Sequence, residues 1–277
     1  MYTVKNVIAG IVTYQPEVKR LAHCLSSVQS QVNKIVVFDN GSSNIEEIRE
    51  LISERCKGVF FIENGENAGI ATALSRIMVY AGREGYMWVL TIDQDSLLQP
   101  GTVDAYLRGA NEFDDAGMFT CLIKDRNFSD AKYESQIEEY KEVPYCITSA
   151  AFTSVDAYQK TAGYDESFFI DCVDFDICYS LRESGFQIIR VNHVGLLHEV
   201  GHGENRRFLW KKIVVYHEKP NRIYYLARNT KRLHKKHKIY GVTKLIKKEV
   251  ALLLRIVLYE DQKSKKLCAF FKGLQDR

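Results

Sequence analysis

Residues 86–96 read Tyr-Met-Trp-Val-Leu-Thr-Ile-Asp-Gln-Asp-Ser, a run of apolar and β-favouring side chains that ends in two carboxylates. An uninterrupted apolar run of this kind is typical of a strand in a sheet that is covered on both faces. Alternation along an extended chain places positions 93 and 95 on the same side. The stretch therefore predicts a buried strand that delivers Asp93 and Asp95 to its carboxyl end.

Three earlier stretches have the same form, and each is followed by a helical pattern. The apolar runs cover residues 7–13, 34–38 and 59–62, and the helical patterns cover 18–32, 45–55 and 70–83. The runs end in polar groups: Thr13-Tyr14, Asp39-Asn-Gly-Ser-Ser43, and Glu63-Asn64 with Asn67 close behind. Strands that alternate with helices predict an α/β fold with a mostly parallel sheet. Ligands bind at the carboxyl ends of such strands, so the four polar ends together predict a binding site.

The bulk composition is that of a globular protein, with 277 residues, 46% hydrophobic and 26% charged. The N-terminal apolar stretch is short and runs into a polar turn, which indicates a first strand rather than a signal peptide. No window reaches the roughly 18 uncharged apolar residues of a membrane span. Seven scattered cysteines without a CxxC pair favour reduced thiols in a cytoplasmic protein over a disulfide framework or a zinc site.

Basic charge is concentrated near the C-terminus. Of the 38 Lys and Arg residues, eight lie within residues 231–248, which contain no Asp or Glu, so the remaining 30 face 35 acidic residues. Apolar residues at helical spacing accompany them: Val242, Leu245, Ile246, Val250, Leu253 and Val257. Residues 242–257, within the basic stretch 231–258, are therefore expected to form a basic amphipathic helix. It would lie on an anionic membrane, or pack on the catalytic domain or on a second copy in a homodimer. No recognition module accompanies the basic run, so nucleic acid is not an expected partner.

Five motifs in a fixed order carry a family resemblance. They are VTYQP, VVFDNGSS, ENAGIATA, TIDQDS, and FFIDCVDFDICYSLRESG with LLHEVG downstream. Over about residues 7–229 the chain resembles the family-2 glycosyltransferases with the GT-A nucleotide-diphospho-sugar fold. FFIDCVDFD and RIYYLARN look most like bacterial rhamnosyltransferases that build cell-surface polysaccharide.

The resemblance implies an inverting transfer from a nucleotide-sugar donor, dTDP-rhamnose or a UDP-sugar. The implied acceptor is a hydroxyl of a glycan or lipid-linked glycan, and the implied location is the cytoplasm or the cytoplasmic face of a bacterial membrane.

The resemblance also implies the residues that bind the nucleotide. Thr13 and Tyr14 would lie beside the base, with Asn67 nearby, and Gly69 would let the backbone pass close to the ligand. Asp39 at a strand end would accept hydrogen bonds from the base or the ribose. An Asx-turn or a helix cap is the alternative role for Asp39.

Two carboxylates would repel a diphosphate, so Asp93 and Asp95 are expected to act with a divalent cation between them and the phosphates. Hard oxygen ligands suit Mg²⁺ or Mn²⁺, which would act as a Lewis acid on the leaving phosphate. The resemblance makes Asp95 the direct ligand and turns Asp93 toward the ribose or sugar. It also implies that His198 of the HxxG motif contacts the metal or phosphate. Arg206, with His202, is predicted to reach the diphosphate from a closing loop.

Asp174 is the predicted base that takes the proton of the acceptor hydroxyl. Its apolar and aromatic flanks would raise its pKa toward a useful value. Asp171 and Asp176 are the competing candidates, and a helix that began near Asp171 would place residues 171 and 174 on one face. Many relatives carry a Glu-Asp pair where this chain has Val173-Asp174, which fits the rhamnosyltransferase-like branch and argues against any mechanism that needs the Glu.

The predicted organisation has three parts: residues 1–96 bind the nucleotide sugar, 97–218 bind the acceptor and carry the base, and 219–277 form the basic helical tail. Two alternatives stay open. One is a nucleotidyltransferase that makes sugar nucleotides, although these normally carry a Gly-rich basic loop where this chain has Thr13-Tyr-Gln-Pro16. The other is an inactive glycosyltransferase-like scaffold in polysaccharide assembly. A DxD phosphatase is disfavoured because its nucleophilic Asp would lie on the first strand.

Overall fold

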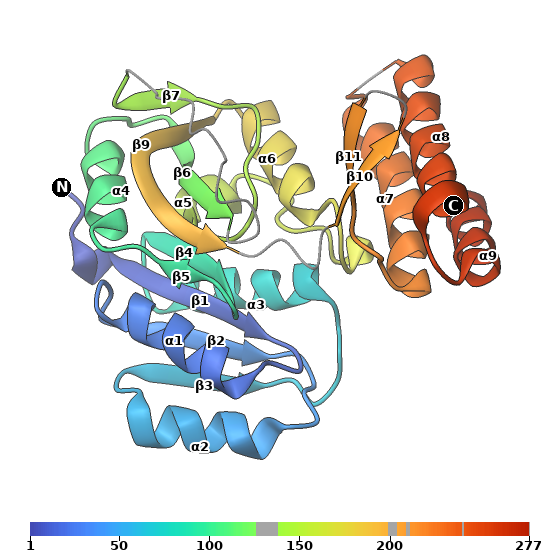
Figure 1. The fold of residues 1–277 in the computed structure, drawn as a ribbon. Helices are drawn as coiled ribbons and strands as arrows, with labels where there is room; N and C mark the ends of the chain where they lie inside the picture. Colours follow the sequence, from blue (N-terminus) through green and yellow to red (C-terminus); the bar gives the residue numbers. More distant parts are fainter. Residues whose placement is uncertain (126–137, 199–203, 209–210, 240, 277) are drawn as a thin grey trace.

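A computed structural model describes residues 1–125, 138–198, 204–208, 211–239 and 241–276. It shows one curled sheet flanked by helices, with a helical bundle at the C-terminal end of the chain (Figure 1).

The four strands with polar ends form one half of a nine-stranded mixed sheet. They are parallel and lie in the order β3-β2-β1-β4: β1 (Val7–Thr13), β2 (Ile35–Asp39), β3 (Val59–Glu63) and β4 (Trp88–Asp93). The chain thus runs outward from β1 to β3 and then returns to the other side of β1. This reversal between β1 and β4 is the switch in strand order at which open α/β sheets bind ligands.

The other half of the sheet mixes parallel and antiparallel pairs. From β4 it continues in the order β8-β6-β9-β5, with β7 paired to β9. The strands are β5 (Leu97–Leu98), β6 (Ala116–Asp125), β7 (Tyr140–Glu142), β8 (Ala151–Ser154) and β9 (Gln187–His198). The ends of β4 and β9 lie near each other, since β5, just after β4, pairs with Leu196 and Leu197.

Helices cover both faces of the sheet, and each face has its own apolar core. One core packs α1 (Val18–Gln29), α2 (Ile45–Arg55) and α4 (Thr102–Ala110). The other packs α3 (Ile70–Arg83), α5 (Val155–Gln159) and α6 (Val173–Glu183). Two short 3₁₀ helices, η1 (Val4–Asn6) and η2 (Glu166–Phe168), complete this part. Because both faces are covered, β1, β2 and β4 are buried almost throughout.

The C-terminal part consists of a hairpin and three helices. The elements are β10 (Glu204–Phe208), β11 (Lys211–Val215), α7 (Pro220–His237), α8 (Val242–Tyr259) and α9 (Lys263–Gln275). Ile223, Ala227, Ile256 and Phe270 form a small core of their own, while Leu233 of α7 joins the core under α3 and α6. Within the described ranges, no helix is both long and apolar enough to cross a membrane.

The predicted α/β class and mostly parallel arrangement of the first four strands are confirmed. The prediction of continuous burial is wrong for β3, which lies at the sheet edge and leaves Phe60 46% exposed. Strand β9 continues to His198, so it includes the LLH segment of the last motif. All seven cysteines are free thiols.

Candidate active site

The carboxyl ends of β1, β2 and β4 bring the predicted donor-site residues into adjacent positions. Thr13 pairs with Asp39 in the register between β1 and β2, and Val12 pairs with Asp93 between β1 and β4. Thr13 and Asp39 are buried, whereas Tyr14 and Asp93 are partly exposed at the edge. The parallel register therefore gathers side chains separated by up to 80 residues of sequence.

Asp39 organises the turn that follows β2. Its carboxylate accepts hydrogen bonds from the Thr13 hydroxyl (2.9 Å), the Ser42 hydroxyl (2.6 Å), and the backbone N–H groups of Gly41 (3.1 Å) and Ser42 (2.8 Å). Four donors match the acceptor capacity of an ionised carboxylate. Asp39 thus forms the Asx-type turn that was its alternative role, and any contribution to nucleotide binding adds to this one.

Asn67 belongs to a second network beside that turn. Its Oδ1 accepts from the Asn40 side-chain amide (3.1 Å) and from the Gly69 N–H (3.0 Å). Gly69 has φ +88°, and a Cβ there would lie 2.6 Å from the carbonyl oxygen of Phe169. The close approach at Gly69 is therefore to the loop that precedes α6, and the expectation that it serves a ligand is not needed to explain the glycine.

The Asp93-Gln94-Asp95 turn is tied to the end of β1. The Gln94 side chain accepts from the Tyr14 N–H (2.8 Å) and donates to the Tyr14 carbonyl (3.2 Å). Asp95 is partly buried, and its side chain has no hydrogen-bond partner among the described residues. Its carboxylate oxygens are therefore available to a ligand at this edge.

His198 reaches the same turn from the end of β9. Its Nδ1 lies 2.7 Å from the Ser96 hydroxyl and 3.9 Å from Asp93 Oδ2. Since Ser96 occupies Nδ1, the other ring nitrogen, Nε2, is the one that can face a ligand. Burial raises the pKa of Asp93, with Asp95 acting in the same direction and His198 opposing it.

The chemistry of Asp95 and His198 fits a divalent cation, because a carboxylate and an imidazole both ligate Mn²⁺ and the carboxylate suits Mg²⁺. Over the described ranges, no three acidic, His or Cys side chains at this edge bring ligand atoms within 4.8 Å of one another. Further oxygen ligands would have to come from a diphosphate and water, as is usual for Mg²⁺ in nucleotide sites.

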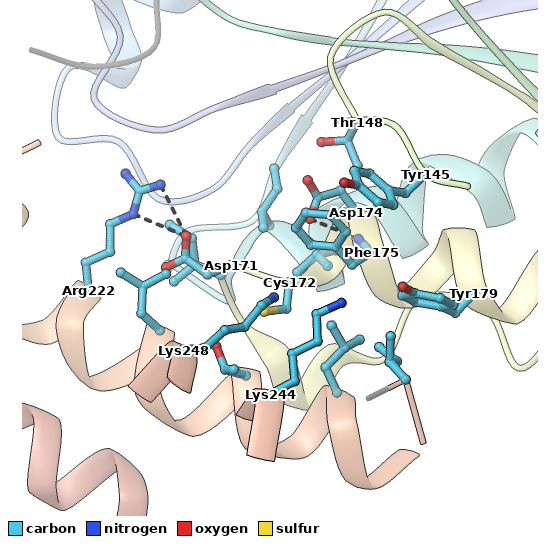
Figure 2. A pocket seen from close by; sticks show the side chains of 17 residues that line it. Tyr145, Thr148, Asp171, Cys172, Asp174, Phe175, Tyr179, Arg222, Lys244 and Lys248 are labelled. Atoms are coloured by element: carbon cyan, nitrogen blue, oxygen red, sulfur yellow. Dashed lines mark hydrogen bonds and ion pairs between the residues drawn. The ribbon is translucent and has the colours of Figure 1, made fainter. Parts of the chain in front are cut away.

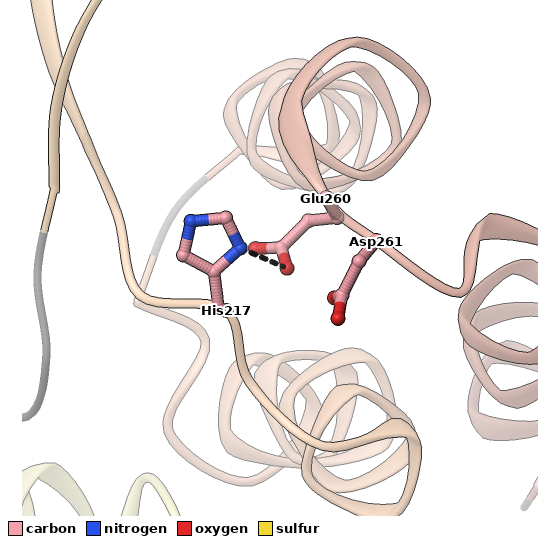
Figure 3. A group of neighbouring side chains, drawn as sticks. All are labelled: His217, Glu260 and Asp261. Atoms are coloured by element: carbon pink, nitrogen blue, oxygen red, sulfur yellow. Dashed lines mark ion pairs between the residues drawn. The ribbon is translucent and has the colours of Figure 1, made fainter.

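A different group, His217, Glu260 and Asp261, does bring its ligand atoms that close together (Figure 3). The ammonium group of Lys266 ion-pairs with both of its carboxylates, at 2.7 Å from Glu260. Lys266 and Glu260 are each almost completely buried. This cluster is an internal salt-bridge network that already contains its cation, so it does not indicate a metal site.

Asp174 lies in a cavity of about 750 Å³ between the start of α6 and helices α7 and α8 (Figure 2). Burial raises its pKa to about 6, with Asp171 and Asp93 adding to the rise and the Phe175 N–H opposing it. Because Asp93 contributes to the raised pKa of Asp174, this cavity is a neighbour of the strand edge, the edge formed by the carboxyl ends of β1, β2 and β4. Thr148, which lines the cavity, precedes Ser149, whose hydroxyl accepts from the Asp93 N–H (3.1 Å).

The two competing carboxylates are engaged elsewhere. Asp171 forms an ion pair with Arg222 of α7 at 3.2 Å (Figure 2). Asp176 is buried and pairs with Lys236 and His237, each at 2.8 Å. Asp174 makes no ion pair with any described residue, and its carboxylate accepts a hydrogen bond from the Phe175 N–H at 2.9 Å. Of the three carboxylates, it is the one without an ion-pair partner among the described residues.

Helix α6 begins at Val173, with Cys172 as its N-cap residue. The expectation that Asp171 and Asp174 share a helix face is therefore wrong. Residue 171 has φ +64° and lies before the helix, where its carboxylate turns to Arg222. Val173 is 4% exposed within the apolar core, so the position that carries Glu in many relatives holds a packing residue in this chain.

Comparison with known proteins agrees with this fold. Residues 9–171 match the family model described as Glycosyl transferase family 2. The chain belongs to this family. Among its relatives, it is 23% identical over 273 residues to the dTDP-rhamnosyl transferase RfbF of Shigella flexneri, covering 94% of this chain and 90% of the relative. It is 24% identical over 245 residues to the N-acetylglucosaminyl-diphospho-decaprenol L-rhamnosyltransferase of Mycobacterium tuberculosis, covering 74% and 79%.

Solved structures share the fold of this family-2 glycosyltransferase. The mannosyltransferase PcManGT of Pyrobaculum calidifontis, in complex with GDP-Man and Mn²⁺, superposes with a TM-score of 0.65 at 15% identity, covering 98% of this chain and 88% of that one. S. aureus TarS in complex with UDP gives a TM-score of 0.59 at 13% identity, covering 97% and 70%. The chain spans 43% of a longer TarS chain. At such identities the likeness concerns the fold.

The structure also reveals residues of the glycosyltransferase that sequence reasoning missed. Three residues just before α6 have positive φ without being glycine: Phe169 (+62°), Asp171 (+64°) and Cys172 (+64°). Such backbone persists only where its surroundings fix it. Asn229 of α7 is fully buried, and its amide donates to the carbonyls of Phe168 (2.7 Å), Ile170 (2.6 Å) and Asp171 (3.1 Å).

Arg228 supports the same loop. Its guanidinium donates to the carbonyls of Ser167 (2.6 Å) and Phe168 (3.2 Å), and to Asn229 Oδ1 (2.9 Å). The RIYYLARN stretch supported the family resemblance, but nothing in it linked these two residues to a loop about 60 positions earlier. A buried Arg-Asn pair on a predicted helix was the available signal.

Arg206 lies on β10, in the two-stranded sheet beside α7 and α8 (Figure 1), and its side chain is exposed. It is not on the strand edge formed by β1, β2 and β4. Its role at the diphosphate stays a prediction. His202 lies outside the described residues.

Proposed function

We propose that this enzyme is an inverting glycosyltransferase in which Asp174 is the base and the Asp93–Asp95 edge holds the nucleotide diphosphate. The observation that carries the proposal is the position of Asp174: a carboxylate without an ion-pair partner among the described residues, in a cavity next to the strand edge, with its pKa raised to about 6. A base with a pKa near the working pH removes a hydroxyl proton efficiently. An inverting displacement needs one such carboxylate and no nucleophilic partner.

On the donor side, Thr13, Tyr14, Asp39 and Asn67 would bind the nucleoside, and Asp93 would face the ribose or sugar. Asp39 would do so mainly by fixing the turn at residues 39–43, since its acceptor positions are filled by that turn. Arg206 would add a positive charge near the diphosphate.

A divalent cation, Mn²⁺ or Mg²⁺, would be held by Asp95 and His198 together with the diphosphate. When bound, it supplies Lewis-acid stabilisation of the charge that develops on the departing diphosphate. The chain's own part is to present the Asp95 oxygens and to orient His198 through the Ser96 hydroxyl. The Mn²⁺ in the PcManGT complex supports this assignment.

The donor sugar we propose is rhamnose, carried by dTDP. The names of the two relatives, both rhamnosyl transferases that match most of the chain, support this choice over a UDP-hexose. The proposed acceptor is a hydroxyl of a cell-surface or lipid-linked glycan, which the enzyme would meet in the cytoplasm or at the cytoplasmic face of the membrane. Family membership disfavours the nucleotidyltransferase alternative, whereas the inactive homologue is separated by experiment.

The test is slow hydrolysis of purified nucleotide sugars with Mn²⁺ or Mg²⁺, because hydrolysis needs no acceptor. Release of dTDP from dTDP-rhamnose, well above release of UDP from UDP-hexoses, is the expected result. If neither dTDP nor UDP shifts the melting temperature in the presence of the metal, the donor site is misassigned. Binding of nucleotide without hydrolysis or transfer to any glycan acceptor would identify the inactive homologue.

A further inference from the structure

Helix α8 carries a row of exposed apolar side chains. Val242, Ile246, Val250 and Leu254 recur every four residues, with exposed fractions of 66%, 55%, 45% and 43%, and Val257 and Leu258 continue the row. Of the fourteen large hydrophobic side chains that are exposed in the described part of the chain, six lie on this helix. A contiguous exposed apolar surface marks a site of interaction rather than ordinary surface.

The adjoining face of α8 fixes its orientation. Leu252, Leu253 and Ile256 pack with residues of α7 and α9 in the C-terminal core. The helix is thus held by one face, and the apolar row points away from the bundle. The sequence pattern of residues 242–257 therefore contains two faces, one that packs on the protein and one that has no cover among the described residues.

A basic flank runs along one edge of the apolar row. At 100° per residue, Lys244, Lys248 and Arg255 fall together on one side of the helix. Lys244 and Lys248 also line the cavity that contains Asp174 (Figure 2). The same helix edge therefore borders both the apolar row and the site where the acceptor would react.

The charge of this region favours an anionic surface over a second copy of the chain. Residues 219–277 contain 17 Lys or Arg and 4 Asp or Glu. Two copies that joined through their apolar rows would bring like charges together, whereas an anionic lipid surface would attract them. Apolar residues on one face with lysines at its edge are the pattern of a helix that lies in the plane of a membrane surface.

We propose that α8 seats its apolar row (Val242, Ile246, Val250, Leu254, Val257 and Leu258) in the surface of a bilayer containing anionic lipids. The cavity next to Asp174 then opens beside that surface, where a lipid-linked acceptor presents its sugar. The role of the cavity rests on the proposed function, while the binding of the helix to the lipid surface does not.

The test is flotation of the full chain with vesicles of phosphatidylcholine alone or with phosphatidylglycerol added. The variant Ile246→Gln/Val250→Gln/Leu254→Gln replaces three of the six residues of the apolar row, and none of the three lines the cavity. Its matched control is Val79→Gln on α3, an exposed apolar residue of similar accessibility (41%). Circular dichroism melting verifies that both variants fold.

The wild-type chain and the control are expected to float with the anionic vesicles, more weakly with phosphatidylcholine alone. In the triple variant the partition coefficient should fall by about tenfold or more. In Lys247→Gln, which removes one charge beside the row, it should fall by about fivefold. Equal flotation of triple variant and wild type would overturn the proposal, as would absence of flotation. The oligomeric state without vesicles is measured by light scattering. If the wild type is a dimer and the triple variant is a monomer, the apolar row binds a second copy of the chain instead.

Hydrolysis of dTDP-rhamnose without vesicles separates this inference from the proposed function. The triple variant should hydrolyse the donor at the wild-type rate, because the apolar row faces away from the cavity. Flotation without any donor hydrolysis by the wild type would refute the proposed function and leave the lipid surface standing. Donor hydrolysis without flotation would refute the binding of α8 to a lipid surface and leave the proposed function standing.

Discussion

Replacement of Asn229 by alanine tests whether α7 holds the loop that presents Asp174. The two N–H groups of the wild-type amide lie within hydrogen-bond distance of the carbonyls of residues 168, 170 and 171, at 2.6–3.1 Å, so one N–H is shared between two acceptors; the side chain is fully buried. Each such bond contributes about 1 kcal/mol net, and a buried carbonyl left without a donor costs more. The variant should therefore lose about 2–4 kcal/mol of unfolding free energy. For a chain of this size that lowers the melting temperature by roughly 5–15 °C.

The same substitution should impair transfer more than nucleotide binding. Asn229 is a positioning residue: it contacts the loop that carries Asp171 and Cys172, next to the proposed base Asp174, and it makes no hydrogen bond to the described residues of the strand edge. A displaced base slows the chemical step, by about 10–100-fold in kcat for a shift on the order of 1 Å. The dissociation constant for dTDP should stay within about twofold.

The assays are thermal melting by circular dichroism, rhamnosyl transfer, and dTDP titration by calorimetry. Asn221→Ala is the matched control on the same helix, since Asn221 is exposed and accepts only from the Arg222 N–H (3.0 Å). Asn229→Asp should be no better than alanine, because a carboxylate would face three carbonyls. If Asn229→Ala melts and turns over like Asn221→Ala, the loop does not depend on this residue and the reasoning fails.

Three further predictions follow from individual groups. The pKa of Asp174 is raised from 3.8 to about 6 in the folded chain, so its contribution to stability falls as pH rises between these two values. Asp174→Asn should therefore melt at a higher temperature than wild type near pH 7, but not below about pH 4. The rate of wild-type transfer should increase as pH rises through about 6. Gly69→Ala should lower the melting temperature and the transfer rate together, since its Cβ would lie 2.6 Å from the Phe169 carbonyl oxygen; wild-type values for both would contradict the close approach. Lys266→Met leaves Glu260 buried without its cation and should cost about 3–5 kcal/mol in urea unfolding, whereas a loss below about 1 kcal/mol would show that His217 compensates.

The first half of the fold and the meeting of its polar strand ends at one edge were predictable from local sequence. Strands β1, β2 and β4 are buried on both faces, so each reads as a continuous apolar run with a polar end. The parallel arrangement then determines that these ends meet. The edge strand β3 was predicted as buried because a short apolar run does not reveal that one side lacks a neighbouring strand.

The choice between carboxylates depended on partners distant in sequence. Asp171, Asp174 and Asp176 share apolar and aromatic surroundings, and sequence reasoning favoured Asp174 without showing where the other two go. Their partners, Arg222 and the pair Lys236–His237, lie 51 to 61 residues later on α7. Only the packing of α7 against α6 separates a carboxylate in the cavity from two in ion pairs.

Helix α8 shows a further limit of periodicity. Helical spacing grouped Leu253 with Val242, Ile246 and Val250, yet Leu253 packs inward and the other three are exposed. A pattern of apolar residues gives the helix and its amphipathic character. When the apolar arc is wide, the pattern does not show which of its residues are covered by protein and which are exposed.

The most direct test of the central claim is rhamnosyl transfer by Asp174→Asn, measured beside its affinity for dTDP in the presence of Mn²⁺. The amide keeps the shape of the side chain and cannot take the acceptor proton. We predict that transfer falls by at least about 10²-fold while the dissociation constant for dTDP changes by less than about threefold. Transfer at the wild-type rate, or loss of dTDP binding together with transfer, would contradict the assignment of Asp174 as the base.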